Sequence, residues 1–246
     1  AMAACAPAAD SDTKTVSLGT SADYPPFEFI YLDDQGAQQY AGIDVSLAKK
    51  LAADMDAELN VVNMNFDSLM ASLEKGDVDF VIAAVEVTED RLKSADFSEP
   101  YYTDLPAMIL VKADKAAEFT SIESFANKNV GAQSGTTKAD IVNNDMPGAK
   151  FVGLTSVIDL VNELMYGKCD AIVLDGAVAM DYAASNSELV VADVALGEAL
   201  PFCVAVQKGD PKGLLESINK SIADALSQAQ DGQTPQASVS PRLVQL

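Results

Sequence analysis

The fold is decided by one stretch of the sequence, Asp79-Phe80-Val81-Ile82-Ala83-Ala84-Val85. A nearly continuous apolar run of this kind is typical of a strand that is covered on both faces of its sheet. Two strand–helix units precede it, because strand patterns over 15–20 and 59–62 are each followed by a helical pattern, over 44–59 and 66–75. This β-α-β-α-β order predicts a parallel sheet with helices on its faces.

A second unit of the same kind follows, with strand patterns over 130–134 and 170–175 and a helical pattern over 156–166 between them. In the first unit, Asp44 is the expected N-cap of its helix. The recurrence predicts two similarly built α/β lobes rather than an array of short repeats. The matching residues are Leu69 and Leu160, Leu73 and Leu164, Gly76 and Gly167, and Asp79 and Asp170, each pair 91 positions apart.

Two such lobes predict a cleft between them. Ligands bind outside the carboxyl ends of the strands in open α/β sheets, so the loops at those ends should face one another. We expect Ala107–Val111 and Phe202–Val206 to be paired hinge strands between the lobes. The expected divisions are a leader over 1–13, lobe 1 over 14–106, lobe 2 over 107–200, a returning strand and helix over 201–228 and a tail over 229–246. The expected cleft loops are 20–28, 84–91, 134–138 and position 175.

The composition excludes several classes of function. The 246 residues include 16 basic and 37 acidic side chains, giving a net charge of −21, and no histidine. A surface this acidic repels phosphate backbones, so we expect no nucleic-acid partner. Without an imidazole, Ser-His-Asp triads, Cys-His pairs and histidine metal sites are not available. No acidic cluster has the spacing of a calcium loop either, so neither a metal nor a cofactor is expected.

Two positively polarised groups lie where an anion would bind in the cleft. Arg91 follows the first lobe's last strand, and a guanidinium suits the two-point capture of a carboxylate. The alternative is a surface arginine paired with Glu89 or Asp90. Ser134–Thr137 leads into a helix, so its backbone N–H groups and the Thr136 hydroxyl could also meet an anion. The alternative there is an ordinary capped helix.

Further cleft residues suit the remaining parts of a zwitterion. Asp175 ends a strand and could receive an ammonium, or it could simply cap the following turn. Tyr24, Phe27 and Phe66 could form an aromatic floor, although aromatic residues at this spacing are more often part of a core. One arginine, one helix N-terminus and one carboxylate describe a receptor, because none of them is a nucleophile paired with a base.

Several motifs resemble the extracellular solute-binding proteins of polar amino-acid ABC transporters, over roughly residues 14–228. They are Gly19-Thr20-Ser21-Ala22-Asp23-Tyr24-Pro25-Pro26-Phe27-Glu28-Phe29, Gly42-Ile43-Asp44-Val45, Gly76-Asp77-Val78-Asp79, the run from Thr88 to Tyr102, Ser134-Gly135-Thr136-Thr137 and Asp170-Ala171-Ile172-Val173-Leu174-Asp175. The resemblance implies a two-lobed type II periplasmic-binding-protein fold that closes on its ligand, with no catalytic residues.

The resemblance also implies roles for individual residues. Arg91 would bind the α-carboxylate of an amino acid, with backbone N–H groups at Glu86 and Thr137. Asp175 would bind the α-ammonium, with the carbonyl of Ala84. The remaining expected ligand-binding residues are Tyr24 and Phe66, which would enclose the ligand side chain, and Thr136.

Two departures from the family pattern stand out. Glu86 replaces a small residue, and together with Glu28 it could face a cationic side chain, which favours arginine or lysine as the ligand. The alternative is that Glu86 points outward. The tail over 229–246 lacks the family's aromatic closing helix, so a loose or unusually packed end is expected.

The expected partners are a free amino acid and the membrane permease of an ABC importer, and the protein is expected to be a monomer. Small residues before Cys5 resemble the end of a lipoprotein signal, which suggests an extracytoplasmic protein anchored by lipid on Cys5. The alternative is an unmodified leader. Two further alternatives remain at this stage: an enzyme similar to cyclohexadienyl or arogenate dehydratases, and a sensory domain that signals.

Overall fold

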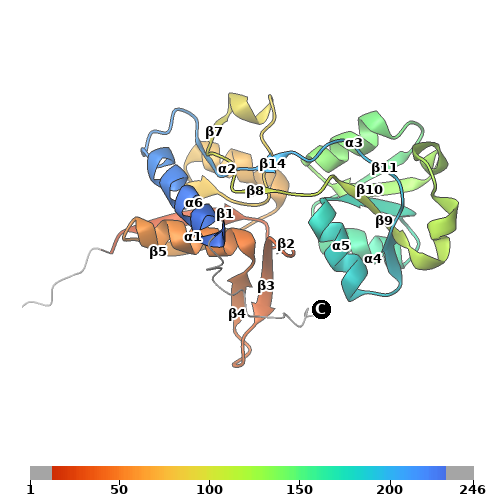
Figure 1. Cartoon of the computed structure of the whole chain (residues 1–246), viewed down its shortest axis with the longest axis horizontal. Helices are drawn as coiled ribbons and strands as arrows, with labels where there is room; N and C mark the ends of the chain where they lie inside the picture. The colour runs from red at the N-terminus through yellow and green to blue at the C-terminus, as the bar shows by residue number, and fades with distance from the viewer. Residues whose placement is uncertain (1–12, 231–246) are drawn as a thin grey trace, which may run out of the picture.

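The computed structural model describes residues 13–230, which form two lobes joined by two strand crossovers. In Figure 1, lobe 1 contains both the first and the last described elements, and lobe 2 is built from the middle of the chain. Lobe 2 is therefore inserted between two parts of lobe 1. Cys5 and most of the tail over 229–246 lie outside the described residues.

The sheet of lobe 1 has five strands in the order β5-β1-β6-β15-β7. β1 pairs in parallel with β5 and β6, whereas β15 runs antiparallel to both of its neighbours. The expected strand over 79–85 is much shorter in the structure, because β6 ends at Val81 and the chain then turns into the cleft. The strands are β1 (Thr15–Thr20), β5 (Glu58–Asn63), β6 (Phe80–Val81), β7 (Ala95–Phe97) and β15 (Ala205–Gln207).

Helices cover both faces of this sheet, and α6 lies beside α1 in Figure 1. The helix expected over 44–59 ends earlier, since α1 stops at Asp54 and β5 follows. Asp44 is not its N-cap: Gly42 occupies that position, and the Asp44 carboxylate is buried. The helices of this lobe are α1 (Ile43–Asp54), η1 (Phe66–Ser68), α2 (Leu69–Lys75), η2 (Arg91–Lys93) and α6 (Leu215–Gln230).

Gly42 can be no other residue without moving the backbone. Its φ is +117°, and a Cβ built there would lie 2.0 Å from the carbonyl oxygen of Phe27. The close approach of Gly42 to Phe27 holds the start of α1 against the loop that enters the cleft. A small antiparallel sheet, β2-β3-β4, continues from the same loop and projects from the lobe in Figure 1. Its strands are β2 (Asp23–Tyr24), β3 (Glu28–Leu32) and β4 (Gln38–Ala41).

Lobe 2 repeats this plan with a five-stranded sheet in the order β11-β10-β12-β9-β13. The strand and helix patterns expected over 130–134, 156–166 and 170–175 correspond to β10, α4 and β12. β9 and β13 add antiparallel pairing on one side. The elements are β9 (Met108–Lys112), η3 (Ala113–Glu118), η4 (Ile122–Phe125), β10 (Asn129–Gln133), α3 (Thr137–Asp145), β11 (Lys150–Leu154), α4 (Val157–Met165), β12 (Ala171–Leu174), α5 (Gly176–Ser185) and β13 (Leu189–Val191).

The hinge differs from the expected pair of strands. The apolar run over 107–111 belongs largely to β9, whereas the run over 202–206 begins in β14 and ends in β15. β9 and β15 lie in different lobes and do not pair with each other. The crossovers are instead two short antiparallel strands, β8 (Tyr102–Thr103) and β14 (Pro201–Phe202). The runs are apolar because they fill sheet cores, and two-residue crossover strands leave little pattern to detect.

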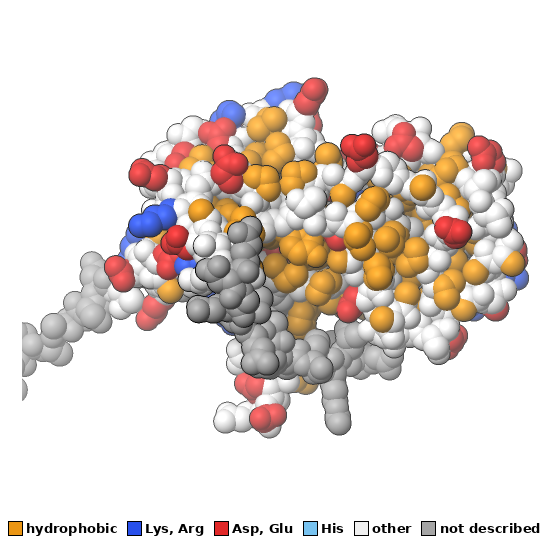
Figure 2. Space-filling view, in the orientation of Figure 1, with side chains coloured by type: hydrophobic (Ala, Val, Ile, Leu, Met, Phe, Trp, Pro, Cys, Tyr) orange, Lys and Arg blue, Asp and Glu red, His pale blue; other side chains and the backbone are white. Residues whose placement is uncertain are grey.

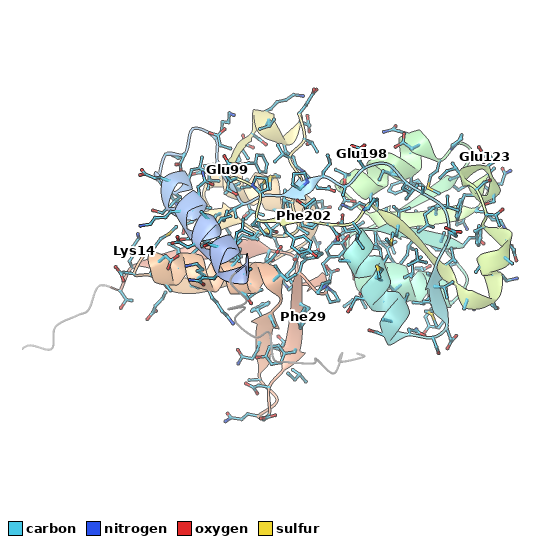
Figure 3. The ribbon with its side chains drawn as sticks, viewed as in Figure 1. Lys14, Phe29, Glu99, Glu123, Glu198 and Phe202 are labelled. Atoms are coloured by element: carbon cyan, nitrogen blue, oxygen red, sulfur yellow. The ribbon has the colours of Figure 1, made fainter. Side chains whose placement is uncertain are left out.

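An aromatic cluster fills the space beside the hinge. The ring of Phe27 packs edge-on against Tyr102 and Phe202, with centroids 5.1 Å apart in each case. Figure 3 shows Phe202 near the middle of the molecule, between the lobes. Phe27 is therefore part of the core and not of an aromatic floor in the cleft. These rings fix the positions of the cleft loops on both sides.

The molecular surface is mixed. Figure 2 shows apolar side chains gathered on the visible face of lobe 2 and along the junction, with acidic side chains scattered around them. Met180 and Leu105 are among the exposed large apolar residues. Within residues 13–230, no helix is both long and apolar enough to cross a membrane.

Candidate functional site

The two lobes enclose a small cavity at the carboxyl ends of their strands. Its volume is about 10 Å³, roughly the space that one water molecule needs. Both lobes line it, and several hydrogen bonds and an ion pair join the lobes around it. The lining residues are Tyr24, Glu28, Phe66, Ala83, Ala84, Glu86, Gln133, Thr136, Lys138 and Asp175. Of the expected ligand-binding residues, only Arg91 and Thr137 are outside this lining. Both of them contact Glu86, which belongs to the lining.

Arg91 reaches across the cleft. Its Nη1 donates to the backbone carbonyl of Glu86 at 2.8 Å, and its Nη2 donates to the carbonyl of Gly135 in lobe 2 at 3.1 Å. The guanidinium lies 5.3 Å from the ring centroid of Phe66, within range of a cation–π contact. Burial lowers the pKa of Arg91, but a guanidinium stays protonated. The alternative of a surface arginine paired with Glu89 or Asp90 is not what the structure has, because the guanidinium reaches these two carbonyls and no salt bridge joins it to either carboxylate within residues 13–230.

Gly135 is needed for this approach of the lobes. It has a φ of +79°, and a Cβ there would lie 3.1 Å from the Cβ of Asp67 in lobe 1. The next residue, Thr136, is the N-cap of α3 and accepts a hydrogen bond from the backbone N–H of Ala139. Its hydroxyl donates to the carbonyl of Gln133 at 2.7 Å. The helix is thus an ordinarily capped one whose first turn faces the cleft.

Asp175 is held from both lobes. Its Oδ2 accepts a hydrogen bond from the Tyr24 hydroxyl at 2.7 Å, and its Oδ1 lies 2.6 Å from the Nζ of Lys138. The Asp175 side chain does not cap α5, although the residue occupies the N-cap position. Burial raises the pKa of the Asp175 carboxyl, and the ammonium of Lys138 acts in the opposite direction. The carboxylate therefore faces cations in the cleft.

Glu86 and Lys138 form an ion pair across the cleft. Glu86 Oε1 lies 3.0 Å from Lys138 Nζ, and the other oxygen of Glu86 accepts a hydrogen bond from the hydroxyl of Thr137. Both charged side chains are buried. Burial opposes the charge on Lys138, but Asp175 and Glu86 together raise its pKa above the ordinary lysine value. Glu86 is therefore occupied by protein groups in this structure.

The backbone at Ala84 is strained. Its φ is +47°, a value uncommon for residues with a side chain. Its N–H donates to the carboxylate of Asp44 at 2.7 Å, and the same carboxylate accepts from the Tyr101 hydroxyl at 2.9 Å. Asp44 thus holds the turn that aims the Ala84 carbonyl. This role replaces its expected position as a helix cap.

Glu28 has the least satisfied polar group in the cavity wall. Its side chain is 1% exposed, and its Oε2 has no hydrogen-bond partner within the described residues. Burial raises the pKa of this carboxyl well above its usual range, and the nearby Asp44 carboxylate raises it further. Two negative charges side by side are therefore disfavoured at this position, and the pKa of Asp44 is raised by burial as well. A cation bound beside this carboxyl would favour its ionised form.

Some residues at the cleft were not among the expected ligand-binding residues. Ala83, Gln133 and Lys138 line the cavity, and Asp44 supports it from behind. Lys138 lies in an expected cleft loop, but a lysine in a first helical turn usually faces solvent, so its side chain was not expected to line the site. Asp23, in the expected loop over 20–28, joins the lobes by accepting the N–H of Val157 at the start of α4, at 2.7 Å.

This arrangement binds charges and lacks an activated nucleophile. Both described cysteines, Cys169 and Cys203, are free and buried, and burial raises the pKa of each thiol to about 11. A thiol with that pKa is a poor nucleophile at neutral pH. The cleft instead presents a guanidinium, a helix N-terminus and three carboxyl groups. Such groups can hold a small zwitterion with a charged side chain.

Comparisons with known proteins agree with this geometry. Residues 16–233 match the model of the bacterial extracellular solute-binding proteins, family 3. The ABC transporter arginine-binding protein 1 of Escherichia coli is 31% identical over 216 residues, which cover 87% of this chain and 86% of that protein. The arginine-binding extracellular protein ArtP of Bacillus subtilis is 33% identical over 220 residues, covering 87% and 82% of the two chains.

A solved structure has the same fold. It is the amino acid ABC transporter substrate-binding protein AbpA from Streptococcus pneumoniae, bound to L-arginine. It superposes with a TM-score of 0.82 at 30% sequence identity, covering 89% of this chain and 90% of that one. These relatives are named as binding proteins, so the dehydratase alternative is wrong.

Proposed function

The chain belongs to family 3 of the bacterial extracellular solute-binding proteins, and on this basis we propose that it binds a free cationic L-amino acid, arginine first, for delivery to an ABC importer. The relatives named above support an amino-acid ligand and a transporter partner. The preference for a cationic side chain and the delivery step are the proposed parts.

The observation that carries the cationic preference is the Glu28 carboxyl. It is buried in the cavity wall, one of its oxygens lacks a partner among residues 13–230, and the Asp44 carboxyl lies beside it. A neutral ligand side chain would leave the buried Glu28 carboxyl without a charge partner, at a cost of roughly 1–3 kcal/mol. A guanidinium can instead pair with the ionised carboxylate through two hydrogen bonds.

The rest of the ligand would be held as the family resemblance implies. We propose that Arg91 and the backbone N–H groups of Glu86 and Thr137 bind the α-carboxylate. Asp175 and the Ala84 carbonyl would receive the α-ammonium. Tyr24 and Phe66 would enclose the aliphatic part of the side chain, and Thr136 would complete the wall.

Binding would couple to rotation of the lobes about β8 and β14. An open form would admit the ligand to Arg91 on lobe 1, and lobe 2 would then close Asp175 and Thr137 over it. A ligand that contacts both lobes shifts the population to the closed form by the difference in its affinity for the two forms. The permease would distinguish the closed form from the open one.

Isothermal titration calorimetry on extensively dialysed protein tests the ligand preference. L-arginine should bind, L-lysine should bind more weakly, and L-glutamine should give no measurable heat. Glu28→Gln should weaken L-arginine binding by about tenfold or more, because a charged hydrogen bond is lost. The matched control is Glu58→Gln, an exposed glutamate at the start of β5. Tighter binding of L-glutamine than of L-arginine would contradict the proposal.

We also propose that the protein acts as a lipid-anchored monomer. Members of the family are extracellular proteins, and the small residues before Cys5 suit a lipid-attachment site. Mass spectrometry of the protein from its native membrane should find acyl groups on Cys5, and light scattering should give the monomer mass. A sensory role would be recognised by neighbouring genes that encode a signalling partner and no permease.

A further inference from the structure

The ion pair between Glu86 and Lys138 lies where an amino acid's own charges are expected. The ammonium of Lys138 is 2.6 Å from Asp175, the carboxylate proposed to receive the ligand's α-ammonium. The carboxylate of Glu86 accepts the hydroxyl of Thr137, and Arg91 is bonded to the backbone of the same glutamate. The ammonium of Lys138 therefore occupies the carboxylate proposed for the ligand's ammonium, while the Glu86 carboxylate anchors Lys138 beside the helix N-terminus at Thr137.

The pair also joins the two lobes. Glu86 follows the end of β6 in lobe 1, whereas Lys138 stands in the first turn of α3 in lobe 2. The Lys138 side chain is about 5% exposed, and that of Glu86 about 8%. Because a zwitterionic ligand would also contact both lobes, this internal pair closes the cleft in the same way as a ligand would.

The cavity has no space for a ligand and the Glu86–Lys138 ion pair at the same time. At about 10 Å³, it holds no more than roughly one water molecule. In the closed form, an amino acid that pairs with Asp175 must therefore displace the ammonium of Lys138 from it. Lys138 can withdraw from Asp175 without losing its charge partner if it stays with Glu86, so an uncompensated buried charge is avoided.

We propose that Glu86 and Lys138 are an internal occupant of the amino-acid site, in which Lys138 competes with the ligand's α-ammonium for Asp175. The choice of arginine as the test ligand rests on the proposed function. The competition makes Lys138 a specificity-determining residue. The competition reduces the contribution of the ligand's α-ammonium to its affinity. When a ligand lacks this ammonium, Asp175 keeps Lys138 as its cation.

Calorimetry with two ligands tests the competition. The ligands are L-arginine and desamino-arginine, in which hydrogen replaces the α-amino group, and the proteins are the wild type and Lys138→Gln. The variant should bind L-arginine about tenfold more tightly, because the competing ammonium is gone. It should bind desamino-arginine about tenfold more weakly, because Asp175 then has no cation. The ratio of the two affinities should thus change by about a hundredfold.

A merely structural role for Lys138 would not move this ratio. The matched control is Lys168→Gln, which removes an exposed lysine of the same lobe that pairs with Glu163 at 2.9 Å. It should leave both affinities unchanged. Lys138→Met serves as a second variant and should reproduce the result of Lys138→Gln. An unchanged ratio, or equal weakening of both ligands, would overturn the proposal.

The shape of the protein without added amino acid gives a test that does not depend on the ligand. Small-angle X-ray scattering should find the dialysed wild type and Lys168→Gln compact, and Lys138→Gln more extended, since Glu86 and Asp175 then repel each other. Equal radii of gyration for wild type and Lys138→Gln would overturn the proposal. If no protein binds arginine but the radii differ, the proposed function fails and the internal occupant stands.

Discussion

The hydroxyl of Tyr24 and the carboxylate of Asp175 are hydrogen-bonded across the cleft at 2.7 Å, although 151 positions separate them in the chain. The backbone N–H of Asp175 also donates to the same tyrosine oxygen, at 3.0 Å. Both residues are buried, and burial raises the pKa of the tyrosine, so the hydroxyl stays protonated. A loop of lobe 1 thereby fixes the position of the main carboxylate of lobe 2.

Tyr24→Phe removes this hydroxyl and leaves the ring. We expect amino-acid affinity to fall by about tenfold, because a buried charged hydrogen bond is lost. Calorimetry with L-arginine measures the change. Tyr31→Phe on β3, away from the cavity lining, is the control and should bind like the wild type. Equal affinities for the two variants would show that the bond does not support the site.

Arg91→Ala should abolish measurable amino-acid binding, since the loss of a buried charge partner costs about 2 kcal/mol or more, a factor of about thirty in affinity. Arg91→Lys should fail to restore it, because an ammonium cannot form the same two-point contact. Calorimetry at raised protein concentration checks both variants. Wild-type affinity in Arg91→Lys would show that geometry is unimportant at this position.

Arginine binding should release a proton from Glu28. Burial and the nearby Asp44 carboxylate raise the pKa of Glu28 well above its usual range, which favours the protonated form of this carboxyl when no ligand is bound. A bound guanidinium favours the ionised form and lowers that pKa, so affinity should increase as the pH rises. Titrations in buffers with different heats of ionisation count the protons released.

The matched variant for this prediction is Glu28→Gln, which has no carboxyl to titrate. Its binding heat should be the same in every buffer, and its weaker affinity should vary little with pH. Proton release that persists in this variant would assign the titration to another group, with Asp44 as the neighbouring carboxyl.

The stability of the fold should depend on Asp23 between pH 4 and 6. Burial is the largest cause that raises the pKa of Asp23 to about 6, even though Val157 donates to its carboxylate. A carboxyl with a raised pKa adds most to stability at low pH, and this contribution is lost as the pH rises through 6. Asp23→Asn should therefore increase the free energy of unfolding at pH 7 to 8 by about 2 kcal/mol, allowing for partial exposure.

Urea denaturation at several pH values measures this effect. The difference between Asp23→Asn and wild type should vanish below about pH 4, where the wild-type carboxyl is protonated in both states. Asp34→Asn, in the exposed turn between β3 and β4, is the control. A difference of the same size at pH 4 and at pH 8 would contradict the assigned cause.

The regular parts of the fold are predictable because they depend on local patterns. Apolar runs and helical stripes identified β1, α2, α4 and β12, and the family motifs identified the two-lobed plan. The predicted pairing of the hinge strands was wrong, because the apolar runs over 107–111 and 202–206 look like any central strand and only Phe202 lies in a crossover strand, β14. Only the pairing partners of β9 and β15 show that these strands belong to separate lobes.

The arrangement of charges in the cleft depends on distant pairs. Glu86 lines the cavity, and its carboxylate pairs there with Lys138, 52 positions away, a partner that no local pattern indicated. Asp44 has the right residue type for a helix cap, yet its carboxylate reaches Ala84 and Tyr101 instead. No local pattern encodes such contacts, since each requires both lobes, or two layers of one lobe, to be assembled first.

The position of β15 has a consequence for the order of folding. This strand is the last among residues 13–230, yet it lies between β6 and β7 in the sheet of lobe 1. Until it has been synthesised, β7 has no neighbour to join it to that sheet, whereas all the strands of lobe 2 are continuous in sequence. Lobe 2 is therefore the unit expected to complete first, and long-range closure of lobe 1 by β15 is the expected slow step.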